Sequence, residues 1–196
     1  MHTYLLFALL GASAVWATPL SVLAPRAVAF SIDTVSYYGS GCAQQNTESK
    51  VSSDGHSVKL TFQGFDAQAG PGIKATDWRK NCNIVLTISH PPGYRPFPDT
   101  ETYRGFAEIA KGQTGTFEFG ATELGAAAST HRIKGRYSSN YELEHTSQSG
   151  PTGNLVCLNN NKLTISLKTA INPTHLVGLL AVTEYDIPIK LLKCVL

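Results

Sequence analysis

The strongest constraint on the fold of this chain is a recurrent alternation of apolar and polar residues with a period of two. It runs through residues 57–62, 84–89 and 162–168. This period is typical of β-strands with one buried face and one solvated face. We therefore expect nine apolar side chains of these segments in the core: Val58, Leu60, Phe62, Ile84, Leu86, Ile88, Leu163, Ile165 and Leu167.

Further strands are expected at 28–38, 103–109, 115–119, 131–137 and 182–196. Glycine- and proline-rich turn signals separate these segments, and helical periodicity is nearly absent. About eight short strands with frequent turns predict an all-β fold, a single jelly-roll-like β-sandwich. The one short helix that the sequence indicates covers residues 122–128.

The N-terminus has the pattern of a secretory signal peptide. The apolar run at 5–12 is too short to span a bilayer, and Val15-Trp16-Ala17 supplies the residues that signal peptidase prefers. We expect a signal peptide over 1–17, cleaved before Thr18, then a flexible arm or short pro-segment over 18–27 and the β-sandwich domain over 28–196. The predicted location is extracellular.

Four cysteines in an exported chain indicate disulfides. They are Cys42, Cys82, Cys157 and Cys194. No two of them form a C-x-x-C pair, which disfavours the competing zinc site. Three pairings are possible, and we favour Cys42–Cys82 with Cys157–Cys194, since each closes a loop of about 40 residues worth roughly 4 kcal/mol.

The charges give no sign of a partner such as nucleic acid or an anionic lipid. Sixteen basic and 14 acidic residues leave a formal net charge of +2, and both signs are scattered along the chain. We therefore expect neither nucleic acid nor a membrane as partner.

Motifs for catalysis are sparse. Gly-x-Ser-x-Gly and His-Glu-x-x-His are absent. Carboxylates two residues apart could hydrolyse glycosides, but they are equally typical of a solvated strand face. There are three such pairs: Asp99 with Glu101, Glu142 with Glu144, and Glu184 with Asp186. The group of Glu142, Glu144 and His145 is better interpreted as a solvated strand end than as a metal site, and we expect no metal and no cofactor.

Aromatic residues near turns are the remaining candidates for a binding surface. Such rings either pack the core of a sandwich or present flat surfaces to sugars and proteins. The predicted binding residues are Tyr94, Tyr103 and Tyr141. Tyr94 is the first of these to test, because four prolines stiffen the loop at 90–99 and reduce the entropy lost on binding.

Several strings together resemble a secreted family that is common in fungi, domain of unknown function 4360. They include Ser36-Tyr37-Tyr38-Gly39-Ser40-Gly41-Cys42, Leu60-Thr61-Phe62-Gln63-Gly64-Phe65, Arg79-Lys80-Asn81-Cys82, Tyr103-Arg104-Gly105-Phe106 and Val182-Thr183-Glu184-Tyr185-Asp186. The resemblance implies an extracellular β-rich protein with a bridge between Cys42 and Cys82. It transfers no catalytic residues, and the ending Leu191-Leu192-Lys193-Cys194 lacks the tryptophan that the family usually has near its last cysteine.

The expected function is a non-enzymatic extracellular module that binds a cell-wall glycan, or a host or cell-surface protein as a secreted effector would. The alternative is a small secreted glycoside hydrolase that uses one of the carboxylate pairs.

Overall fold

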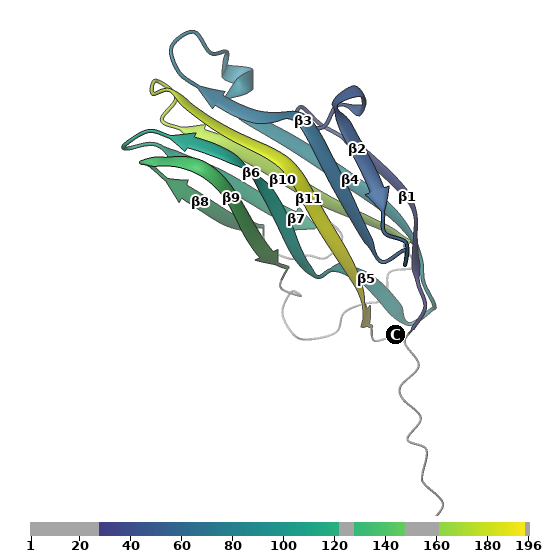
Figure 1. The fold of residues 1–196 in the computed structure, drawn as a ribbon. Helices are drawn as coiled ribbons and strands as arrows, with labels where there is room; N and C mark the ends of the chain where they lie inside the picture. Colours follow the sequence, from purple (N-terminus) through teal and green to yellow (C-terminus); the bar gives the residue numbers. More distant parts are fainter. Residues whose placement is uncertain (1–27, 122–127, 148–160, 195–196) are drawn as a thin grey trace, which may run out of the picture.

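The computed structural model describes residues 28–121, 128–147 and 161–194. These residues form two stacked sheets of antiparallel strands (Figure 1). The all-β sandwich predicted from the sequence is therefore confirmed. The predicted signal peptide, the arm at 18–27, nearly all of the predicted helix at 122–128, and Cys157 lie outside the described residues.

The first sheet, sheet A, has the strand order β1-β4-β10-β7-β8. Its strands are β1 (Ser31–Tyr38), β4 (Arg79–Ser89), β10 (Lys162–Asn172), β7 (Thr114–Ala121) and β8 (Ser129–Lys134). Strands far apart in the sequence are therefore neighbours in this sheet, as β4 and β10 are.

The second sheet, sheet B, has the order β2-β3-β11-β6-β9, with β5 also paired to β11. Its strands are β2 (Thr47–Val51), β3 (Ser57–Ala69), β11 (Gly178–Lys193), β6 (Thr100–Ile109), β9 (Tyr137–Thr146) and β5 (Tyr94–Pro98). Two short 3-10 helices, η1 (Gln44–Asn46) and η2 (Ala75–Asp77), precede β2 and β4.

The sequence predicted a loop at 90–99, but the structure has strand β5 within this segment, so that prediction is wrong. Pro96 and Pro98 lie two residues apart, so the positions without an N–H are on the same side of the strand. Asp99, one residue further, donates its backbone N–H to the carbonyl of Pro188 on β11 at 2.8 Å. The prolines therefore fall on the unpaired side of an edge strand, where they cost no ladder hydrogen bond.

The core lies between the two sheets and contains all nine apolar residues that the alternation predicted. Ile84, Leu86 and Leu167, for example, are fully buried. Large aromatic side chains from both sheets complete it, among them Phe65, Phe117 and Tyr185. Burial of a side chain of this size contributes about 1.5–3 kcal/mol, so this layer dominates the stability of the fold.

Gly105 on β6 shows how closely the core is built. A Cβ at this position would lie 1.9 Å from the carbonyl oxygen of Ala181 and 2.6 Å from the hydroxyl of Tyr141. That hydroxyl uses the vacant space to donate a hydrogen bond to the Ala181 carbonyl at 2.6 Å. Tyr141 therefore bonds to β11 only because residue 105 has no side chain.

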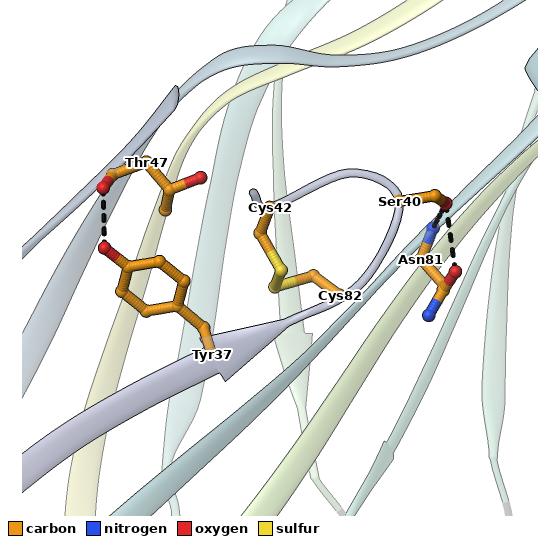
Figure 2. The surroundings of a disulfide bond; sticks show 6 residues. All are labelled: Tyr37, Ser40, Cys42, Thr47, Asn81 and Cys82. Carbon is orange, nitrogen blue, oxygen red and sulfur yellow. Dashed lines mark hydrogen bonds between the residues drawn. A yellow bond between two sulfur atoms is a disulfide. The ribbon is translucent and has the colours of Figure 1, made fainter. Parts of the chain in front are cut away.

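The predicted bridge between Cys42 and Cys82 is confirmed (Figure 2). Both residues are fully buried, and the bridge joins the segment after β1 to β4 across a sequence separation of 40. Cys194 is also disulfide-bonded. Its expected partner, Cys157, lies outside the described residues, so that pairing stays a prediction.

The double variant Cys42→Ala/Cys82→Ala should lose about 4 kcal/mol of free energy of unfolding, because the unfolded chain regains the entropy of a loop of this length. Urea denaturation followed by circular dichroism measures the loss. A decrease below about 1 kcal/mol would show that the bridge is not a major constraint on the unfolded chain.

Candidate functional site

The carboxylate pair of Asp99 and Glu101 does not form a hydrolytic dyad. Asp99 precedes β6 and accepts a hydrogen bond from Lys190 Nζ at 2.6 Å. Glu101, by contrast, is 1% exposed and points into the sandwich. The two carboxylates therefore lie in different environments and do not face a common cleft.

The other two pairs lie on the outer face of sheet B within a network of ion pairs. Arg104 donates from Nε to Glu142 at 2.8 Å and from Nη1 to Asp186 at 2.5 Å. Lys59 donates to Glu184 at 2.9 Å. A glycosidase needs a protonated carboxyl and an ionised one on either side of a sugar, and these cation-bound carboxylates do not provide that arrangement.

Glu101 belongs to a buried polar cluster that the sequence analysis missed. Its Oε1 accepts a hydrogen bond from the hydroxyl of Tyr185 at 2.8 Å, and its Oε2 lies 3.9 Å from Nε2 of His145. Burial raises the pKa of the Glu101 carboxyl to about 7, against the opposing effect of the hydrogen bonds from Tyr185 and Ser147. Burial, and secondarily the charge of His131, lower the pKa of His145.

The cluster contains a serine, a histidine and an acid, but it lacks the geometry of a catalytic triad. Ser129 Oγ lies 3.1 Å from both ring nitrogens of His145, so it is not directed at either one of them. A triad needs the serine at one nitrogen and the carboxylate at the other. The His145 ring also stacks on Phe119, with centroids 4.9 Å apart, so the cluster is part of the packed core.

Of the three tyrosines predicted to bind a ligand, two are buried in the core and one is half-buried. Tyr103 is fully buried, and its hydroxyl lies 2.6 Å from Nδ1 of His131. Tyr141 is 7% exposed and bonds to β11. Their rings are therefore enclosed by the core. Tyr94 is half-buried at the start of β5.

The side chains of Glu142, Glu144 and His145 point to opposite faces of sheet B. The two glutamates are exposed on the outside of sheet B, whereas His145 is 9% exposed and faces the core. Their side chains therefore do not converge. Among residues 28–121, 128–147 and 161–194, no group of three or more His, Cys, Asp or Glu side chains is placed to hold a metal ion.

The candidate site is instead a hollow of about 460 Å³ on the outer face of sheet A. Strands β4, β10 and β7 form its floor with side chains that point away from the core. These outward side chains are Arg79, Asn81, Asn83, Thr116, Glu118 and Lys168. A hollow of this size falls within the usual range for a small-ligand pocket.

The disulfide fixes one wall of this hollow, because successive side chains of a strand point to opposite faces. Cys82 points inward to its bridge, so Asn81 and Asn83 on either side of it point outward. Ser40 Oγ lies 3.0 Å from Asn81 Oδ1 and accepts the backbone N–H of Asn81 at 3.1 Å (Figure 2). Gly39 permits this approach, since a Cβ there would lie 2.2 Å from the Asn81 carbonyl oxygen.

Tyr38 lies beside Asn83, one of the residues that line the hollow. It is directly opposite Asn83 on the neighbouring strand, which puts both side chains on the same face. Tyr38 is 60% exposed, and the other aromatic residues that the structure describes are buried or half-buried. Tyr38 was not among the residues predicted to bind, because the sequence does not show which face a ring occupies.

Comparisons with known proteins give a family but no activity. The sequence model of the family "Domain of unknown function (DUF4360)" matches residues 29–192. An uncharacterized secreted protein of Arthroderma benhamiae is 29% identical over 145 residues, covering 71% of this chain. The chain spans 58% of the length of that relative. The predicted extracellular location agrees with this secreted relative.

Among solved structures, one similar to this chain is TmCBM61 in complex with β-1,4-galactotriose. It is 7% identical, covers 83% of this chain and 90% of its own, and has a TM-score of 0.25. That degree of likeness is too low for an argument about the site. Within the described residues, no helix is long and apolar enough to cross a membrane.

The pKa of Glu101 predicts a specific pH dependence of stability. Folded Glu101 holds its proton up to about pH 7, whereas the unfolded residue releases it near an ordinary 4.5. Its contribution to the free energy of unfolding is therefore complete below pH 4.5 and is lost as the pH rises through 7, by about 3 kcal/mol.

The variant Glu101→Gln should lack this dependence. Urea denaturation of both proteins from pH 4 to pH 8 measures the effect as the difference between the two stability curves. Stability curves that run parallel over this range would contradict the assignment.

Proposed function

We infer the function of this chain from its site, because the chain belongs to DUF4360, a family of unknown function. We propose that it is an extracellular carbohydrate-binding module and that the sugar lies in the hollow on the outer face of sheet A. The observation that carries this proposal is the exposed ring of Tyr38 directly opposite the outward amide of Asn83. We further propose that export uses the predicted signal peptide at 1–17.

The chemistry of the hollow suits a sugar. An asparagine amide both donates and accepts hydrogen bonds, as a ring hydroxyl does, and Asn81 and Asn83 present two such groups side by side on one strand. The carboxylate of Glu118 accepts two further hydroxyl hydrogens. The flat face of Tyr38 provides an apolar surface for the C–H groups of a sugar ring.

The position of the hollow on a sheet also favours binding. Asn83 is held by ladders to both β1 and β10. Asn81 is held by the ladder to β10 and, on its other side, by hydrogen bonds to Gly41 and Ser40 beside the disulfide. Side chains on so rigid a support lose little conformational entropy when a ligand arrives. A protein partner is less suitable, because the core of a protein interface requires a larger apolar area than one tyrosine provides.

Tyr38→Ala should weaken binding to an insoluble polysaccharide about tenfold, corresponding to roughly 1.4 kcal/mol of lost contact with the ring. Depletion isotherms against chitin, β-glucan, cellulose and pectin measure the affinity. Reducing-sugar release in the same tubes tests for hydrolysis at the same time.

Phe106→Ala is the matched control, because Phe106 is an outward-facing aromatic residue of sheet B and should leave the affinity unchanged. Loss of binding with Tyr94→Ala but not with Tyr38→Ala would move the site to β5. Steady release of reducing sugars would favour the hydrolase instead.

A further inference from the structure

The outer face of sheet A is rich in cations. Its outward charged side chains are Arg79, Arg132, Lys134, Lys162 and Lys168, with the carboxylates Asp33 and Glu118. Lys168 lies 3.8 Å from Glu118. In the described part of the chain, no carboxylate lies within 4.0 Å of the charged nitrogens of Arg79, Arg132 or Lys134.

Sheet B has the opposite balance on its outer face. Its outward carboxylates are Glu48, Asp66, Glu108, Glu142, Glu144, Glu184 and Asp186, and its outward cations are Lys50, Lys59, Arg104 and Lys190. Here Lys59, Arg104 and Lys190 each pair with a carboxylate. Charges that are scattered along the sequence are therefore segregated between the two faces of the folded sandwich.

From this segregation we propose that the ligand of sheet A is an anionic polysaccharide, whose sugar rings carry carboxylates. This inference rests on the proposed function and adds the chemical class of the ligand. The cationic groups of Arg79, Arg132 and Lys134 attract carboxylates, and arginine binds them through two parallel hydrogen bonds.

The arrangement of the cations indicates a polymer. Arg79 on β4 and Arg132 on β8 lie in one row across the sheet, because Ala170 and Thr116 connect them in register. Three strand spacings separate them, which is about 14 Å. Lys168 lies between them in the next row. Cations spread along a line do not converge on one small anion, but they match a ligand whose charges repeat along its length.

Carbohydrate suits this face better than nucleic acid does. Single-stranded nucleic acids bind on several aromatic side chains that stack successive bases. Among the described residues of this face, Tyr38 is the one exposed aromatic ring. Amides, hydroxyls and the carboxylate of Glu118 make up the rest of the hollow, and these groups match the hydroxyls of a sugar.

The test compares polygalacturonate with its carboxyl-reduced form, which keeps the sugar backbone but is neutral. Isothermal titration at 50 and 500 mM NaCl should give at least tenfold tighter binding to the acidic polymer at low salt, and most of this advantage should disappear at high salt. The double variant Arg132→Glu/Lys134→Glu should lose at least tenfold in affinity for the acidic polymer. Lys50→Glu, on the outer face of sheet B, should lose nothing.

The outcomes separate this inference from the proposed function. Equal, salt-independent binding of both polymers would overturn the anionic ligand and leave carbohydrate binding intact. Binding of neither polymer, nor of the insoluble polysaccharides, would overturn both. Single-stranded DNA bound as tightly as polygalacturonate would overturn the choice of ligand. Thermal melts of each variant establish that the charge reversals leave the fold intact.

Discussion

The alternation of side chains along each strand is the constraint on which this structure depends. A strand such as β4 supplies Cys82 to the core and Asn81 and Asn83 to the surface, so one register determines both stability and the proposed site. A slip by one residue would exchange the two faces. The pairing register of β11 shifts between Val182 and Glu184. Val182 before this shift and Tyr185 after it both face the core, so the inward face of the strand stays continuous.

The parts of the fold that depend on local patterns could be predicted from the sequence. Alternation identified the nine core residues, and the spacing and context of the cysteines identified the Cys42–Cys82 bridge. Tyr103 and Tyr141 were selected for binding although both are buried. The alternation along β6 could have indicated the burial of Tyr103, since Tyr103 lies an even number of residues from Ala107 and Ile109 and so shares their inward face. Glu101 lies on the same inward face, where a charge is unexpected.

The candidate site could not be predicted, because its residues come from segments that only the strand order brings together. Asn83 meets Tyr38 on one side and Ser166 on the other. The chain also passes repeatedly between sheets: β3 belongs to sheet B, β4 to sheet A, β6 to sheet B and β7 to sheet A. Acidic and basic segments that alternate along the sequence are thereby sorted onto different faces. This separation of charge is not visible in the sequence, along which both signs are scattered.

The opposite charge of the two outer faces gives the described sandwich an electric dipole that its formal net charge of +2 does not reveal. The faces belong to sheets that pack about 10 Å apart, and the Debye length at about 0.1 M salt is of similar size. A nearby charged surface therefore exerts a torque on the molecule before contact. A negatively charged surface turns sheet A toward it, and a positively charged surface turns sheet B. The orientation of approach is thus encoded in the strand order.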